Sequence, residues 1–157
     1  VHKSDVGGVV LNICDDHTLE MEYKRMMRID GCIGVLLQPM ISGTQLFVGA
    51  KREDKFGHLV MCGLGGIYIE VLKDISYGIS PISAVEAEEM IHHLHSYKLI
   101  EGVRGQEGVN EAIFNETIRR VSALCSCAPE IFEMDINPLM GNQKSVTAVD
   151  ARIRIEK

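Results

Sequence analysis

A strict alternation of polar and apolar residues in FEMDINPL (132–139) most constrains what this chain can fold into. Glu133, Asp135 and Asn137 occupy every second position, and apolar side chains fill the positions between them. Alternate side chains of a β-strand point to opposite faces of a sheet. The stretch therefore predicts a strand with one apolar face and one face that carries a row of side-chain oxygens.

A second alternating stretch, SVTAVDARIRI (145–155), follows after a turn near Gly141. If the two strands pair as a hairpin, their polar faces coincide, and Asp150 lies near Asp135 and Asn137. Carboxylate and amide oxygens are the ligands that Mg²⁺ selects, often together with substrate phosphates. The residue pattern leaves two interpretations open, a cation site or a solvated sheet face with charge pairs.

The rest of the chain predicts an α+β fold, an antiparallel sheet flanked by helices. Apolar runs bounded by glycine, proline or polar residues predict further strands at 6–13, 31–40, 43–52, 55–61, 67–74 and 75–82. Helix-forming runs predict helices at 17–27, 83–97 and 108–125. Ser83 followed by Glu86 has the spacing of a capping box. Many strands joined by short turns favour a mostly antiparallel sheet, and no interdomain linker is evident within 1–157.

Charge and hydropathy exclude two classes of function. The 157 residues carry a net charge of −6 with a pI of about 5.5, whereas nucleic-acid binders need a basic surface. No apolar run approaches the roughly 20 residues of a membrane-spanning helix. We therefore expect neither a nucleic-acid nor a membrane partner.

The cysteine and histidine patterns do not predict a zinc site. Five cysteines without a CxxC pair or a signal peptide favour reduced thiols and a cytoplasmic protein. Cys125 and Cys127 lack a second ligand pair at a usual spacing. The HHLH run (92–95) has the wrong spacing for one face of a helix, so we expect an exposed helix surface.

Three glycines, Gly63, Gly65 and Gly66, precede the predicted strand that contains Glu70. The pattern is neither a Walker loop nor a dinucleotide-binding turn, because no helix follows it. Clustered backbone N–H groups can still bind a phosphate. The alternative is a tight turn or a β-bulge.

Several isolated residues have one functional and one structural interpretation each. His2, beside a glycine pair, is either a phosphoryl acceptor or a solvated side chain. Arg52 either contacts anionic oxygens or is solvated. The segment of Leu37, Gln38 and Met40 is either a hinge between lobes beside a ligand or a core strand that ends in a turn.

Several ordered blocks of the sequence resemble one family. The blocks are HKSDVGGV, GVLLQPM, LFVGAKREDKFGHLVMCGLGGIYIEVLKDIS, LIEGVRG, EMDINPL and AVDARI. Together they resemble the ATP-grasp domain of NDP-forming acyl-CoA synthetases, which include the ADP-forming acetyl-CoA synthetases. The resemblance covers nearly the whole of 1–157, but the family domain is longer at its N-terminus. Gln45 stands where the family often has Glu, and His58 where it more often has Pro.

The resemblance implies a fold, a reaction and cofactors. The fold is an ATP-grasp lobe, and the reaction is acyl-CoA + ADP + phosphate ⇌ acid + CoA + ATP. The cofactors are ATP or ADP with Mg²⁺. The implied partner is a CoA-binding domain or subunit that carries a phosphohistidine, in an oligomeric full-length protein. The fragment alone is expected to be inactive.

The resemblance also implies a role for each candidate residue. His2 would relay the phosphoryl group, and Arg52 and Glu70 would assist beside the glycine loop. Asn137 and Asp150 would bind Mg²⁺, with Asp135 adjacent. Adenine would be contacted near Leu37, Gln38 and Met40. Gly63, Gly65 and Gly66 would contact the phosphates or the phosphohistidine loop.

Two alternatives lie close to this assignment. One is a non-catalytic, regulatory domain of the same kind within a protein acetyltransferase. The other is a subunit like those of succinyl-CoA ligases, against which the HKSD and GLGG blocks argue. Retention of His2, Asn137 and Asp150 favours the catalytic interpretation.

Overall fold

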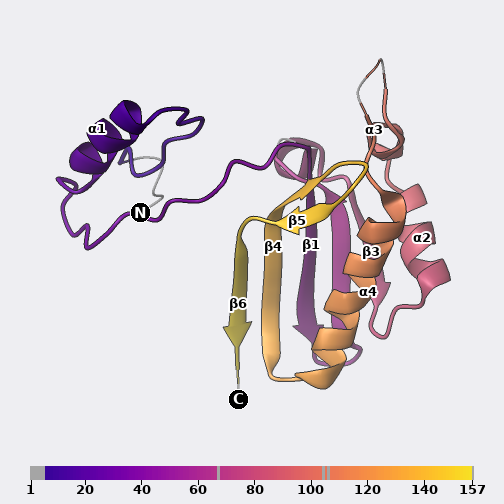
Figure 1. Cartoon of the computed structure of the whole chain (residues 1–157). Helices are drawn as coiled ribbons and strands as arrows, with labels where there is room; N and C mark the ends of the chain where they lie inside the picture. The colour runs from indigo at the N-terminus through magenta and orange to yellow at the C-terminus, as the bar shows by residue number, and fades with distance from the viewer. Residues whose placement is uncertain (1–5, 67, 104, 106, 157) are drawn as a thin grey trace. The chain divides into compact units, whose positions relative to one another are not determined.

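The computed structural model describes residues 6–66, 68–103, 105 and 107–156 (Figure 1). The chain divides into two compact units, Val1–Ile41 and Ser42–Lys157. The boundary falls directly after the segment in which a hinge was predicted. Among the described residues, none of the helices has the length and apolar character needed to cross a membrane.

The first unit contains one helix, α1 (Asp16–Met26), within its described residues. Asp15 caps this helix, because its carboxylate accepts a hydrogen bond of 2.8 Å from the backbone N–H of Thr18. The side chain of Arg25 donates a hydrogen bond of 2.7 Å to the carbonyl of Gly7 and ties the helix to the preceding segment.

The second unit is an antiparallel sheet in the order β3-β2-β1-β4-β5, and β6 also pairs with β4 (Figure 1). Its strands are β1 (Thr44–Glu53), β2 (Gly57–Leu64), β3 (Ile75–Ile79), β4 (Ile131–Gly141), β5 (Val146–Ala148) and β6 (Ala151–Ile155). Its helices are α2 (Ala84–His92), α3 (Tyr97–Glu101) and α4 (Glu111–Cys127). The predicted α+β fold with a mostly antiparallel sheet is confirmed.

Helices α2 and α4 cover one face of this sheet and form the core with it. Leu46, Val48 and Ala50 of β1 are fully buried and point toward this side. They pack with Ile91 of α2 and Phe114 of α4, among others. The intervening side chains of β1, β2 and β4 therefore lie on the opposite side of the sheet, here called the open face.

Three predicted strands are wrong. Residues 6–13 and 31–40 form no strand, since the first unit supplies no paired strand among its described residues and an unpaired strand leaves its backbone groups unbonded. The run 67–74 forms a π-helical turn, Tyr68–Leu72, instead. The run 145–155 is a strand in two parts, with a break at residues 149–150 between β5 and β6.

Candidate active site

Asp135, Asn137 and Asp150 come together on the open face, as the alternation predicted. Strands β4 and β6 pair with Asp135 opposite Arg152 and Ile136 opposite Ala151. The next pair along is Asn137 with Asp150, and the backbone N–H of Asn137 donates to the Asp150 carbonyl at 3.2 Å. The predicted hairpin is thus confirmed, and its pairing puts Asp150 close enough to Asp135 for the charge of one to affect the other.

The electrostatics of this group suit a bound cation. Burial raises the pKa of the Asp135 carboxyl, the charge of Arg152 opposes this rise, and the nearby charges of Glu133 and Asp150 add to it. The ionised carboxyl is therefore disfavoured in the folded protein even with Arg152 nearby. A divalent cation bound by these hard oxygens would remove that penalty, so the residues present fit Mg²⁺.

Gly65 and Gly66 lie against the same group. A Cβ atom on Gly65 would lie 3.4 Å from Asn137 Oδ1 and 3.2 Å from the Leu46 carbonyl oxygen. Gly66 has a φ of +60°, and a Cβ there would lie 2.7 Å from Gln45 Oε1. The turn therefore brings the backbone of Gly65 close to Asn137, where a side chain would fill the space beside it, and a side chain at Gly66 would meet Gln45.

The glycines do not all act as the phosphate loop that the sequence suggested. The backbone N–H of Gly65 donates to the Gln45 carbonyl at 2.8 Å, so this donor is already used within the protein. Gly63 lies within β2 opposite Phe47. A Cβ on Gly63 would lie 2.5 Å from the Asp74 carbonyl oxygen, which gives this glycine a packing reason of its own.

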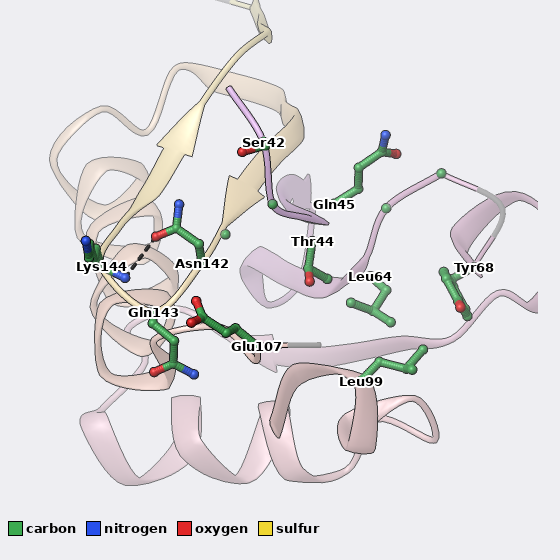
Figure 2. A pocket seen from close by; sticks show the side chains of 14 residues that line it. Ser42, Thr44, Gln45, Leu64, Tyr68, Leu99, Glu107, Asn142, Gln143 and Lys144 are labelled. Atoms are coloured by element: carbon green, nitrogen blue, oxygen red, sulfur yellow. Dashed lines mark hydrogen bonds between the residues drawn. The ribbon is translucent and has the colours of Figure 1, made fainter. Parts of the chain in front are cut away.

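A cavity of about 830 Å³ adjoins Gly65 and Gly66 at the end of the sheet (Figure 2). The end of β2, the start of β1, helix α3 and the turn after β4 contribute its walls. Besides these two glycines and Gln45, it is lined by Ser42, Gly43, Thr44, Leu64, Tyr68, Leu99, Glu107, Gly141, Asn142, Gln143 and Lys144. The cavity is large enough for a small molecule or for a peptide segment.

A tight turn holds the polar wall of the cavity in place. Asn142 Oδ1 accepts hydrogen bonds from the backbone N–H groups of Lys144 at 2.8 Å and Ser145 at 3.0 Å (Figure 2 shows the first). Asn110 binds the same turn, because its side-chain amide donates to the Gln143 carbonyl at 3.1 Å. The turn brings one cation, Lys144, to the cavity wall, to which Glu107 contributes an anion.

Arg52 does not lie beside the glycine turn, which corrects the predicted adjacency. In the β1–β2 hairpin Arg52 pairs with His58, whereas Leu46, close to Gln45, pairs with Leu64. Arg52 lies at the far end of β1, where its guanidinium donates to the Pro129 carbonyl at 3.1 Å and lies 3.9 Å from Glu156. These contacts give it a structural role.

The other predicted residues are not joined to this site by the described structure. Leu37, Gln38 and Met40 belong to the first unit, where their side chains are exposed. Glu70 lies in the π-helical turn, but its side chain falls outside the part of the chain that the structure describes. His2 also lies outside the described residues. Their roles remain predictions.

Apart from Gly65 and Gly66, the residues that line the cavity were not predicted as site residues from the sequence. They come from segments far apart in the chain, and each segment shows only an ordinary turn or helix-end composition. The run GNQKS predicts a turn but not what the turn faces. Only the juxtaposition of Thr44, Leu99 and Asn142 by the fold creates the cavity.

The sequence is similar to proteins with an ATP-grasp domain, among them ADP-forming acetate–CoA ligases. The ATP-grasp domain family matches residues 1–155. Acetate–CoA ligase (ADP-forming) I of Archaeoglobus fulgidus is 38% identical over 160 residues, which cover 98% of this chain and 23% of the relative. The β subunit of acetate–CoA ligase (ADP-forming) I of Pyrococcus furiosus is 38% identical over 161 residues, 98% of this chain and 69% of the subunit.

A solved structure shows the same fold. Acetyl-coenzyme A synthetase 1 of Ca. Korarchaeum cryptofilum matches with a TM-score of 0.86 and 35% sequence identity, over 99% of this chain and 71% of that chain. The present chain thus spans about a quarter of the Archaeoglobus relative, 23%, and about two thirds of the Pyrococcus subunit, 69%.

Proposed function

Because this chain belongs to the ATP-grasp domain family, alongside the β subunits of ADP-forming acetate–CoA ligases, we propose that it is the nucleotide-binding part of an ADP-forming acyl-CoA ligase. The observation that carries the proposal is the group of Asp135, Asn137 and Asp150 on the open face, beside the Gly65–Gly66 turn. In this role the chain takes part in the reaction acyl-CoA + ADP + phosphate ⇌ acid + CoA + ATP.

The cofactors are ADP or ATP with Mg²⁺. The related synthetase of Ca. Korarchaeum cryptofilum was solved in complex with coenzyme A and Mg-AMPPCP. Asn137 and Asp150, with Asp135 adjacent, would hold the cation, which neutralises phosphate charge when it is bound. Leu37, Gln38 and Met40 would contact adenine. Phosphoryl transfer depends mainly on such positioning and charge neutralisation.

The residues around the cation site have defined tasks in this proposal. Gly65 keeps the space beside Asn137 clear, so that phosphate oxygens can approach its side chain, and Gly66 does the same beside Gln45. Burial and the neighbouring carboxylates disfavour the ionised form of Asp135, and a bound cation would stabilise that form. We assign no part of the reaction to Arg52, whose guanidinium is bound at the other end of β1.

The partner in this proposal is a CoA-binding domain or subunit that carries a phosphohistidine. In the related synthetase the phosphohistidine segment points towards the nucleotide binding site. The cavity beside Gly65 has the size for such a segment, and Lys144 on its wall would attract a phosphorylated side chain. His2 would relay the phosphoryl group between that segment and the nucleotide.

The test is Mg-ADP binding to the full-length protein, measured by calorimetry. Asn137→Ala and Asp150→Ala should each weaken binding by about tenfold or more, since each removes a ligand of the cation. Glu133→Gln is the matched control, because Glu133 lies on the same strand and face but is exposed. It should stay within about twofold of the wild type. Unchanged affinity in both ligand variants would remove these residues from the site.

The relay role of His2 has a separate test in the same protein. His2→Asn should abolish ADP-dependent ATP formation from acyl-CoA and phosphate while Mg-ADP binding persists, because an amide cannot accept the phosphoryl group as imidazole does. Undiminished turnover of the variant would rule the relay out and would leave the nucleotide site as proposed.

A further inference from the structure

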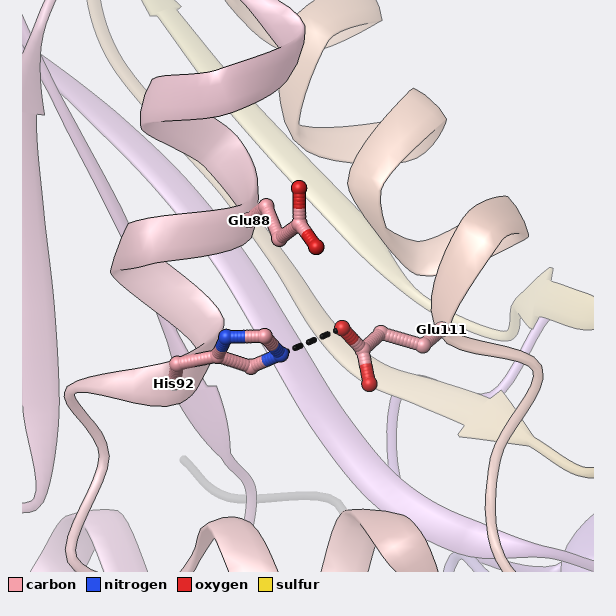
Figure 3. A group of neighbouring side chains, drawn as sticks. All are labelled: Glu88, His92 and Glu111. Atoms are coloured by element: carbon pink, nitrogen blue, oxygen red, sulfur yellow. Dashed lines mark hydrogen bonds and ion pairs between the residues drawn. The ribbon is translucent and has the colours of Figure 1, made fainter.

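Three metal-ligating side chains meet on the helical side of the second unit. Glu88 and His92 come from α2, and Glu111 comes from the start of α4 (Figure 3). Each offers one ligand atom, and these atoms all lie within 4.8 Å of one another. None of the three lines the cavity, and α2 and α4 cover the sheet face opposite to the open face. The cluster is therefore separate from the nucleotide site.

Local structure explains why the three side chains converge. Glu88 and His92 are four residues apart, so they project from the same side of α2 one turn apart. Glu111 is the first residue of α4, and Asn110 fixes its position by accepting a hydrogen bond of 3.1 Å from the N–H of Ile113. The packing of α2 against α4 then brings Glu111 to the His92 ring.

Tyr97 contacts two members of the cluster and holds their side chains in place. The hydroxyl of Tyr97 donates to Glu111 Oε2 at 3.0 Å, while Glu111 Oε1 lies 2.7 Å from His92 Nε2 (Figure 3 shows the second contact). The rings of His92 and Tyr97 pack edge to face with their centroids 4.6 Å apart. A hydrogen-bonded group behind a ligating carboxylate is the usual second layer of a protein metal site.

We propose that Glu88, His92 and Glu111 form a Zn²⁺ site that links α2 to α4. One imidazole nitrogen and two carboxylate oxygens are ligands that Zn²⁺ takes, whereas Mg²⁺ prefers an all-oxygen shell. Tetrahedral bonds of about 2.1 Å place ligand atoms roughly 3.4 Å apart. The ligand atoms here lie within 4.8 Å of one another, so a closing movement of the exposed Glu88 and His92 side chains toward the part-buried Glu111 would bring them to that spacing. Water would complete the fourth position.

The proposal makes His92 different from its neighbours in the HHLH run. His93 Nδ1 lies 2.7 Å from the Glu89 carbonyl oxygen, and the exposed His95 is not part of the cluster. The run therefore supplies one ligand, and the other two come from Glu88 one turn earlier and from another helix. The sequence pattern alone gave no sign of this set, because Glu111 lies 19 residues beyond His92.

The experiment titrates Zn²⁺ into the full-length protein by calorimetry, with the exposed Cys14 and Cys127 alkylated so that their thiols do not bind the metal. His92→Asn and Glu88→Gln should each weaken Zn²⁺ binding by at least about tenfold. His95→Asn is the matched control, an exposed histidine three residues away, and should bind like the wild type. Zn²⁺ should also raise the Tm of the wild type and of His95→Asn more than that of the two ligand variants.

Two results would overturn the proposal. One is a wild-type protein that binds no Zn²⁺ at 100-fold molar excess, which would leave the cluster as an ion pair between two helices. The other is Zn²⁺ binding of equal strength in the wild type and in Glu88→Gln. Glu88 is exposed, so this variant should keep the fold, and circular dichroism checks that it does. Asn137→Ala should leave Zn²⁺ binding unchanged, which separates this site from the nucleotide site.

Discussion

On the open face, folding raises the pKa of the Asp135 carboxyl above its ordinary value. Its pKa is raised by burial and by the charges of Glu133 and Asp150, although Arg152 opposes the rise. A carboxyl with a raised folded-state pKa destabilises the folded protein above that pKa, and the penalty disappears as pH falls through it. Stability and cation binding are therefore coupled at this position.

This coupling predicts the behaviour of Asp135→Asn. At neutral pH and without Mg²⁺ the variant should have a higher Tm than the wild type, because the disfavoured charge is gone. The gain should shrink as pH falls below the folded-state pKa, where the wild-type carboxyl is already protonated. Thermal unfolding at several pH values measures this. A gain that grows in acid would contradict it.

Gly63 is constrained by packing rather than by phosphate binding, which yields a second prediction. Gly63→Ala would place a Cβ 2.5 Å from the Asp74 carbonyl oxygen and 2.9 Å from the Phe47 ring. We expect a loss of about 1–3 kcal/mol in the free energy of unfolding, measured with urea.

Gly34→Ala is the control for this prediction. In the described structure a Cβ at Gly34 meets no atom within 4 Å. Its stability should change by less than about 0.5 kcal/mol. Equal stabilities of the two variants would show that β3 and Phe47 move aside at little cost.

The sequence predicted some site residues and not others for a physical reason. The common face of Asp135, Asn137 and Asp150 could be predicted because a period of two assigns each side chain to a face, and hairpin pairing then joins the two faces; their role as cation ligands stays a prediction. Arg52 was placed beside the glycine turn by the family resemblance, whereas the β1–β2 pairing puts Arg52 opposite His58 and Gly63 opposite Phe47, at opposite ends of the strands. The alternating pattern predicts the face of the sheet on which a side chain lies but not which other residues lie beside it along the strands.

At the scale of elements, the helix starts were predicted well because capping signals are local, but the helix predicted over 83–97 ends at His92, and α3 (Tyr97–Glu101) follows as a separate helix. The predicted capping box at α2 is confirmed, since Ser83 accepts from the Glu86 N–H at 3.2 Å and Glu86 accepts from the Ser83 N–H at 2.8 Å. Strands need partners from elsewhere in the chain. The apolar runs 6–13 and 31–40 therefore satisfied the strand pattern but not the pairing that a strand requires.

The capping box supports a third prediction. Ser83→Ala should lower the free energy of unfolding by about 1 kcal/mol, because the Glu86 N–H loses its acceptor. Hydrogen bonds from Ser83 lower the pKa of Glu86, so the contribution of this carboxylate is present above its ordinary pKa and is lost as pH falls through the folded-state value. The loss in free energy of unfolding caused by Ser83→Ala should accordingly be smaller at acidic than at neutral pH.

Ser83→Thr controls for the loss of the hydroxyl, which threonine retains as a cap. Urea unfolding of both variants at neutral and acidic pH provides the comparison. If threonine were as damaging as alanine, the loss would come from the backbone near Ser83 and not from the cap.

At the scale of the molecule, the second unit carries its own hydrophobic core. The buried core residues all come from residues 46–139, within Ser42–Lys157. The core joins the sheet to α2 and α4. The sequence predicted one domain fragment and left open a hinge near Gln38, and the boundary after Ile41 lies directly beyond that segment.

This division predicts that a truncated chain, residues 42–157, folds by itself. It should unfold cooperatively in urea, with a midpoint close to that of the longer chain, because no core contact is removed. Far-ultraviolet circular dichroism measures the transition. A broad transition without a clear midpoint would show that the first 41 residues are needed to complete the fold.

The strand order has a consequence for how the protein is made. β1 pairs with β2 through a local hairpin, but its other edge pairs with β4, about 80 residues later, as in Lys51 with Glu133. During synthesis the β1–β2 hairpin can form long before β4 emerges. Until then the apolar face of β1 stays uncovered and its second edge stays unpaired. Any pause in translation between α2 and β4 would prolong that exposure, and the nascent chain would then need a chaperone to prevent edge-to-edge association.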